Sequence, residues 1–192
     1  MRQRWIYAVG AALVIAAILA VLLAVEKSND HNDKTSQTSS QKPASSPTFA
    51  KRQACTIFTL SDAKQVLGDS AKGGSSAGAA SSDDLSVSTC TYTQDTGSSV
   101  PVSAGQSATL LVRSPKTAAG STSNSNQFGA LRPTATQTVE GYGDGAYWDP
   151  QYGQLNILKH STWYILSSGP ITPSSRTLDE AKQLADILIS KM

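Results

Sequence analysis

Beyond residue 50 the chain contains a single histidine, His160, which is the first residue to consider for chemistry. Serine and aspartate are abundant, so a Ser–His–Asp arrangement for nucleophilic hydrolysis is formally available. However, His160 and Ser161 form a tight connection between two predicted strands, and a side chain at a hairpin tip is expected to be solvated. One histidine and two cysteines do not supply the converging ligands that a metal requires. The sequence therefore predicts no catalytic residue, metal or cofactor, with an envelope hydrolase that uses His160 as the alternative.

The glycines and carboxylates of residues 141–149 are the next candidates. The glycine spacing from Gly141 to Gly145 is G-x-G-x-G and a strand follows, whereas a dinucleotide loop needs G-x-G-x-x-G before a helix. A turn or bulge is the favoured interpretation. Asp144 and Asp149 could act as paired carboxylates or calcium ligands. The strand between them would hold them roughly 16 Å apart, too far for a glycosidase pair, so we expect surface carboxylates.

An aromatic cluster is the best functional lead in the sequence. Six aromatic residues lie close together: Tyr142, Tyr147, Trp148, Tyr152, Trp163 and Tyr164. Strand alternation prevents all of them from facing inward. Ordinary packing of strand aromatics against the sheet is the simplest explanation, with the two tryptophans in the core. Exposed aromatics suit recognition of a ligand or protein, and on that basis Tyr142, Tyr147 and Tyr152 are the predicted binding residues.

The charge distribution excludes one class of partner. From Lys51 onward the chain has 11 Lys and Arg and 11 Asp and Glu, so this region is neutral, and the net charge of +2 arises from the N-terminal segment. Binding to a nucleic-acid backbone requires clustered basic residues. No basic stripe is present, so nucleic-acid binding is not expected.

The N-terminal segment predicts a membrane anchor. Residues 5–25 form an uncharged apolar run of 21 residues, and about 20 residues span the hydrocarbon core. The run is long for a cleaved signal peptide, and the Leu23-Ala24-Val25 sequence at its end is a poor cleavage site. A lipoprotein would need a cysteine directly after the run, and none is present. We therefore expect a cytoplasmic tail (1–4), an uncleaved signal anchor (5–25), and a single-pass location in the cell membrane.

The flanking charges alone do not decide which side of the membrane the domain occupies. Arg2 and Arg4 favour a cytoplasmic N-terminus, but two lysines also follow the apolar run. Cys55 and Cys90 are even in number, which in an exported chain indicates one disulfide; the alternative is two free buried thiols in a cytosolic protein. The disulfide makes sense in an oxidising compartment, so an extracytoplasmic domain is the prediction.

Residues 26–50 are rich in Ser, Thr, Gln, Lys and Pro, and this composition predicts a disordered linker. The Gly/Ala/Ser-rich segment 69–84 is likewise predicted to be a mobile loop.

A domain over residues 51–192 is expected from the pattern of helix and strand signals. Helices are expected at 60–67, capped by Thr59 with Asp62, from Ser114-Pro115 to 131, and from Thr177 with Glu180. Strands are expected at 85–94 and 108–113, followed by a three-stranded meander over 146–167.

This order of elements predicts an α+β fold, with a mostly antiparallel sheet of about five strands covered by two or three helices and preceded by the transmembrane helix.

The layout also resembles a known group of proteins. The sequence Cys55-Thr56-Ile57-Phe58-Thr59-Leu60-Ser61-Asp62-Ala63, then Leu67-Gly68 and Cys90-Thr91-Tyr92, resembles the opening of secreted actinobacterial lipoprotein domains of unknown function. The Gly141-to-Trp148 stretch with its following hairpin and helix also resembles them, and the extracellular sensor domains of mycobacterial receptor kinases are distantly similar. The lipidation cysteine of the lipoproteins is missing here. The resemblance implies an extracytoplasmic α+β module with a Cys55–Cys90 bridge, and no catalytic residues.

Together these patterns predict a membrane-tethered binding, sensing or protein-interaction domain that is not an enzyme. Its partners would be the membrane, through the N-terminal helix, and an envelope protein or small ligand that the sequence does not identify.

Overall fold

The structure is a computed structural model that describes residues 49, 51–78, 81–95 and 105–192. The predicted tail and anchor, and all of the predicted linker except Phe49, lie outside these residues. Within the described ranges, no helix has both the length and the apolar character needed to cross a bilayer. Residues 46–192 cluster into one compact unit, to which the following description applies.

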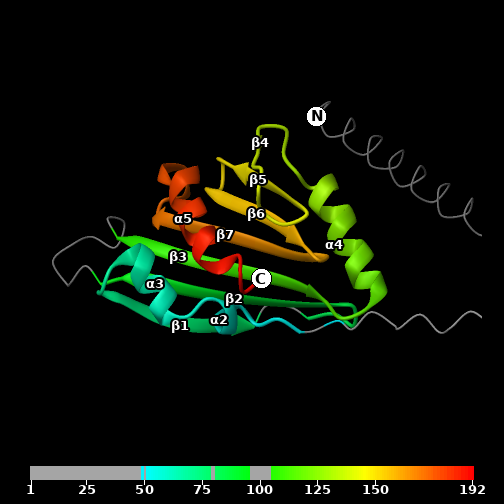
Figure 1. Ribbon diagram of the computed structural model, residues 1–192, viewed down its shortest axis with the longest axis horizontal. Helices are drawn as coiled ribbons and strands as arrows, with labels where there is room; N and C mark the ends of the chain where they lie inside the picture. The colour runs from blue at the N-terminus through cyan, green and yellow to red at the C-terminus, as the bar shows by residue number, and fades with distance from the viewer. Residues whose placement is uncertain (1–48, 50, 79–80, 96–104) are drawn as a thin grey trace, which may run out of the picture. The chain divides into compact units, whose positions relative to one another are not determined.

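A seven-stranded antiparallel sheet in the order β1-β2-β3-β7-β6-β5-β4 runs through the described part of this unit (Figure 1). The strands are β1 (Ala71–Gly78), β2 (Leu85–Gln94), β3 (Gln106–Pro115), β4 (Gln137–Thr138), β5 (Gly145–Asp149), β6 (Gln154–Lys159) and β7 (Thr162–Pro170). The pairing of β3 with β7 joins the two sequence-local groups of strands into one sheet. The predicted α+β class is confirmed, although the sheet has two more strands than expected.

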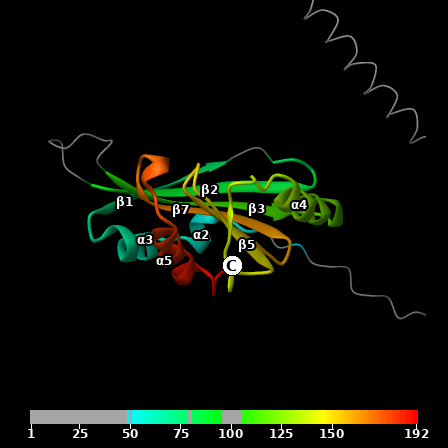
Figure 2. The ribbon, with the colours of Figure 1, turned by 90° about the horizontal axis from the view of Figure 1, so that it is seen from above.

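The core lies on one face of the sheet. On β2 the buried side chains are at alternate positions, from Ser86 to Tyr92, as expected for a strand with one face inward. The same face continues across the sheet through Leu110, Val112, Tyr164, Leu166, Leu155 and Ile157, which are all fully buried. The helices α2 (Ala54–Ile57), α3 (Leu60–Leu67) and α5 (Leu178–Leu188) lie together on one side of the sheet (Figure 2). Their apolar faces bury the core against the sheet.

Both predicted capping boxes are present. The Thr59 hydroxyl accepts from the Asp62 backbone, and the Asp62 carboxylate accepts from the Thr59 backbone. Thr177 and Glu180 do the same at the start of α5. These reciprocal bonds satisfy backbone donors that a helix N-terminus otherwise leaves unpaired. Both helix starts could therefore be predicted from residues three positions apart.

Helix α4 (Ala118–Ala130) begins later than expected. The predicted cap at Ser114 is wrong because β3 continues through Pro115, and the helix is capped by Thr117 instead. Ser114 is fully buried, and its hydroxyl oxygen accepts a hydrogen bond from the Arg52 backbone nitrogen at 3.3 Å. This tertiary contact outweighs the local Ser-Pro signal for a helix start.

The prediction that 69–84 is a mobile loop is wrong for residues 71–78. Residues 71–78 form β1, which pairs antiparallel with β2 from Ala71–Gln94 to Gly78–Ser88. The sequence AKGGSSAG has almost no intrinsic strand preference. Its strand conformation comes from backbone hydrogen bonds to β2, and a register shift between Gly73 and Ser75 marks a bulge in it.

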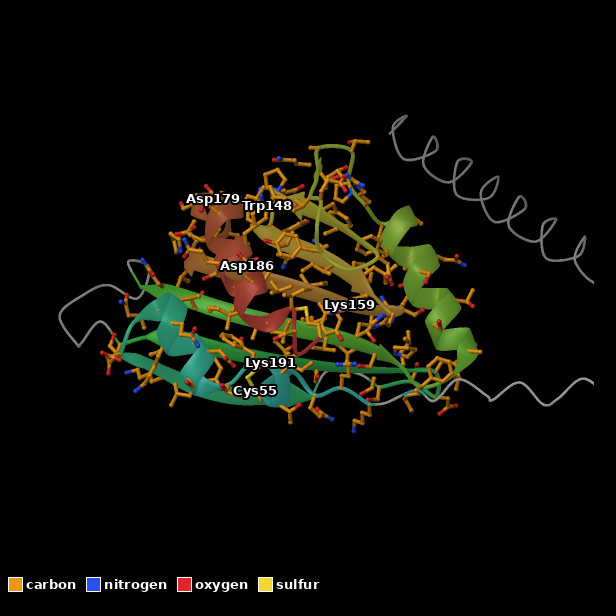
Figure 3. All side chains as sticks on the ribbon, in the orientation of Figure 1. Cys55, Trp148, Lys159, Asp179, Asp186 and Lys191 are labelled. Atoms are coloured by element: carbon orange, nitrogen blue, oxygen red, sulfur yellow. A yellow bond between two sulfur atoms is a disulfide. The ribbon has the colours of Figure 1, made fainter. Side chains whose placement is uncertain are left out.

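Two tertiary links tie the first helices to the rest of the unit. Cys55 and Cys90 form the predicted disulfide, with a Cα–Cα distance of 5.1 Å, and it joins α2 to the buried face of β2. At the other end of the chain, Lys191 forms an ion pair with Asp62 of α3 (Figure 3). Lys159 of β6 donates a hydrogen bond to the carbonyl of Ile189 at 2.9 Å, which joins the end of α5 to the sheet.

Candidate functional site

One end of the second face of the sheet is apolar, and the described helices cover it only in part (Figure 2). Antiparallel sheets commonly bury one face and keep the other polar. Here the outward positions of three adjacent strands carry the aliphatic side chains Leu85, Val87, Leu111 and Ile165, all half-buried. Helix α4 packs at the edge of this area, where its Gly120 lies against Asp84 and Leu85, and leaves the rest of it open. These half-buried aliphatic side chains therefore leave apolar surface exposed to water at this end of the sheet.

A groove of about 400 Å³ lies on this face. Its lining consists of Ser81, Ser82, Leu85, Val87, Leu111, Arg113, Trp163 and Ile165. The sheet register explains this grouping: Val87 is paired with Arg113, Arg113 with Trp163, and Leu111 with Ile165. Two successive rows of outward side chains thus form the floor. The volume lies within the range of small-molecule sites.

Arg113 is the polar centre of the groove. Its guanidinium carbon lies 5.7 Å from the centre of the Trp163 ring, which is a cation–π arrangement. Burial lowers the pKa of Arg113 below its ordinary value, because the charged form loses solvation. Trp163 is itself held in place, since its ring nitrogen donates to the Asn156 side chain at 3.1 Å. The arrangement places one positive charge on a rigid aromatic support.

Helix α4 forms the wall beside the groove. Phe128 of α4 packs against Trp163 at 5.8 Å and against Tyr147 at 5.0 Å between ring centres. Asn124, also on α4, donates from its side chain to the carbonyls of Arg113 and Ser161, both at 2.8 Å. The helix is therefore fastened to the ends of β3 and β7, and this fixes the backbone that carries Arg113.

The three predicted binding tyrosines do not come together in the described structure. Tyr147 is buried, which contradicts the expectation that it could lie outside, and Arg132 lies 5.2 Å above its ring. Tyr152 is 52% exposed, at the turn that follows β5. Tyr142 is half-buried, and its hydroxyl donates to Asp186 on α5 at 2.8 Å.

Tyr142 borders a second hollow. This second hollow has a volume of about 300 Å³ and is bordered mainly by residues 138–146, with Phe128 and Arg132. Burial and the hydrogen bond to Asp186 raise the pKa of Tyr142 to about 12, so its hydroxyl stays protonated at physiological pH. The hydroxyl is already used as a structural donor to α5.

His160 occupies the predicted hairpin tip. His160 and Ser161 both have positive φ angles, +49° and +59°, as in a tight two-residue turn. The backbone nitrogen of His160 donates to Asp144 at 2.7 Å. The nearby carboxylate is thus engaged by the main chain, and the His160 side chain is exposed. This contact gives Asp144 a turn-stabilising role.

Strand β1 contains a serine motif that resembles one found in hydrolases. Residues 74–78 match G-x-S-x-G, the sequence of a nucleophile elbow. An elbow is a sharp turn between a strand and a helix, whereas these residues lie within a strand at the edge of the sheet. Two strands separate β1 from β7, so the His160 turn is roughly 14 Å or more away.

The remaining sequence candidates have structural roles. Asp149 accepts from the backbone nitrogens of Gln151 and Tyr152, which stabilises the turn after β5. Gly143 has a φ of +60°, and its backbone lies so close to Leu158 that an added Cβ would be 2.4 Å from that residue's carbonyl oxygen. Across the described residues, no group of three His, Cys, Asp or Glu side chains could hold a metal ion.

The groove residues were not among the sequence predictions, although one signal pointed to them. Leu110, Leu111 and Val112 are consecutive apolar residues, so apolar side chains face both sides of β3. The same is true of β7 from Trp163 to Leu166. Continuous apolar runs indicate strands with both faces in apolar surroundings. Arg113 and Trp163 are fifty positions apart, and only the β3–β7 pairing brings them together.

Comparisons of this chain with known protein families, with curated proteins and with solved structures found no match.

Proposed function

We propose that this protein is a membrane-tethered, extracytoplasmic binding or sensing domain without catalytic activity, and that the groove on the open sheet face is its binding site. The apolar run at residues 5–25 would supply the tether, and the linker would hold the domain away from the bilayer. The Cys55–Cys90 disulfide supports an oxidising location.

The observation that carries this proposal is the apolar groove on a sheet face that the described helices leave open. Leaving aliphatic side chains such as Leu111 and Ile165 partly in water forgoes roughly 25 cal/mol for each Å² of apolar surface that could be buried. A concave apolar site with a few polar groups is the usual form of a ligand pocket. Binding of a ligand would remove this surface from water.

The proposal can be tested by mapping where an apolar probe binds the full chain in phosphatidylcholine vesicles. The probe is a decanol that carries a photoreactive diazirine, and the cross-linked peptides are identified by mass spectrometry. We expect labelling of residues 81–87, 111–113 and 163–165, reduced at least fivefold in the Leu111→Asp variant. Labelling of residues 5–25 would support the tether in the same experiment.

A matched control is Leu60→Asp. Leu60 is 42% exposed, but it lies on α3, on the opposite side of the sheet from the groove. This variant should leave groove labelling unchanged. Labelling spread evenly over the surface of the domain, or equal labelling in wild type and Leu111→Asp, would contradict the proposal.

A further inference from the structure

Within the described residues, the guanidinium of Arg113 contacts the Trp163 ring but has no anionic or hydrogen-bonding partner. No salt bridge and no hydrogen bond from this side chain is present. The other half-buried arginines behave differently. Arg176 donates to the carbonyls of Pro170 and Ile171, and Arg52 donates to the carbonyl of Lys191. Partly buried charges are normally paired in this way, so Arg113 is an exception that needs explaining.

The surroundings of Arg113 increase the need for a negative partner. Leu111 and Ile165 lie in the row of side chains on one side of Arg113, and Leu85 lies on the other side. The ring of Trp163 packs against the guanidinium. An anion placed here would form charge-assisted hydrogen bonds with a planar, two-pronged donor. The electrostatics favour a ligand with one negative group.

The dimensions of the groove limit the rest of the ligand. The volume of about 400 Å³ is at the lower end of the range for small-ligand sites, so it limits the ligand to a small molecule. Its lining beyond Arg113 is mostly aliphatic, with two serines at one end. A medium-length unbranched alkyl chain satisfies both limits.

We infer that the groove binds a single-chain amphiphile with a carboxylate head, such as a medium-chain fatty acid. The carboxylate pairs with Arg113, and the alkyl chain lies over Leu111 and Ile165. This inference rests on the proposed function and adds the chemical class of the ligand. Arg113 is the specificity-determining residue because it distinguishes the ionised acid from an uncharged chain of the same length.

The test compares two diazirine probes of equal length, decanoate and decanol, on the full chain in phosphatidylcholine vesicles at pH 7.5. Half-saturating probe concentrations for labelling of the groove peptides are measured for each variant. We expect the wild type to prefer decanoate by at least tenfold, as hydrogen bonds between charged groups imply. Arg113→Gln should remove this preference, and Arg113→Lys should restore part of it, because lysine keeps the charge without the two-pronged geometry.

The matched control is Arg132→Gln. Arg132 also stacks on an aromatic ring, that of Tyr147, but it is exposed and lies outside the groove. This variant should retain the tenfold preference. Circular dichroism spectra and melting curves establish that each variant is folded.

The outcomes separate the two proposals. If both probes label the groove equally in wild type, the groove binds apolar ligands and the carboxylate inference is overturned. If the preference for decanoate survives in Arg113→Gln, the inference is also overturned, because a group other than Arg113 then binds the carboxylate. If neither probe labels the groove, the proposed function itself fails.

Discussion

The Nζ atom of Lys191 lies 2.6 Å from Oδ1 of Asp62, so the last residues of the chain are joined to the first capped helix across 129 positions of sequence. The other carboxylate oxygen, Oδ2, accepts from the backbone and the hydroxyl of Thr59. Asp62 is 5% exposed, so both carboxylate oxygens accept hydrogen bonds at a position that water barely reaches.

This arrangement predicts a pH-dependent stability. Burial alone would raise the pKa of Asp62, but the hydrogen bonds from Lys191 and Thr59 outweigh it and lower the pKa below the ordinary value of 3.8. A lowered folded-state pKa gives stability that is present above about pH 4 and is lost as the pH falls through the folded-state value. Asp62→Asn should reduce the free energy of unfolding by about 1–2 kcal/mol at pH 7 and flatten its pH dependence.

Urea denaturation between pH 2.5 and 7 measures this effect. Lys72→Met is the matched control because the Lys72–Asp95 pair is about half exposed on both sides, and such surface pairs contribute less than about 1 kcal/mol. Identical pH curves for wild type and Asp62→Asn would contradict the assigned role of Asp62.

The Cys55–Cys90 disulfide should contribute a large share of the stability. It links residues 35 positions apart, and a loop of this size corresponds to about 3–4 kcal/mol in the chain-entropy model. The Cys55→Ala/Cys90→Ala double variant is expected to lose this amount in chemical denaturation, and a reducing agent should destabilise only the wild type. Two freely alkylated thiols in the full chain, detected by mass spectrometry, would show that the bridge does not form.

Two neighbouring glycines separate the cost of a strained backbone from the cost of a steric clash. Gly141 and Gly143 both have positive φ, +88° and +60°, but an added Cβ meets nothing within 4 Å at Gly141 and lies 2.4 Å from the Leu158 carbonyl oxygen at Gly143. Gly141→Ala should therefore destabilise by about 1 kcal/mol, from backbone conformation alone. Gly143→Ala should cost more than about 2 kcal/mol. Equal melting temperatures for the two variants would mean that the turn does not pack against β6 as described.

Local sequence signals predicted the elements that local interactions determine. The strand over 85–94 matches β2 at both ends, because its alternation is set by one buried face. The helix starts at Thr59 and Thr177 match because capping depends on residues three positions apart. The prediction failed for 71–78, where a sequence with almost no strand preference becomes β1 by pairing with β2.

The candidate site was harder to predict for a related reason. The sequence indicated a β2–β3 hairpin and a C-terminal meander, but nothing local specifies that β3 pairs with β7. That long-range pairing places Arg113 beside Trp163 and creates the open apolar face. Of the aromatic cluster, Trp163 lines the groove and Tyr147 is buried. Arg113, the charged residue of the groove, was not among the predicted residues.

The most direct test of the binding groove uses the indole resonances of the three tryptophans. Trp163 lies in the groove, whereas Trp148 faces the core on the opposite side of the sheet and serves as an internal control. Decanoate is titrated into the full chain, labelled with ¹⁵N-tryptophan in lipid nanodiscs, and each indole N–H shift is followed. We predict a saturable shift of the Trp163 resonance with no change at Trp148, and a half-saturating decanoate concentration at least tenfold higher in Arg113→Gln. An unmoved Trp163 resonance, or equal shifts of Trp163 and Trp148, would contradict binding in the groove.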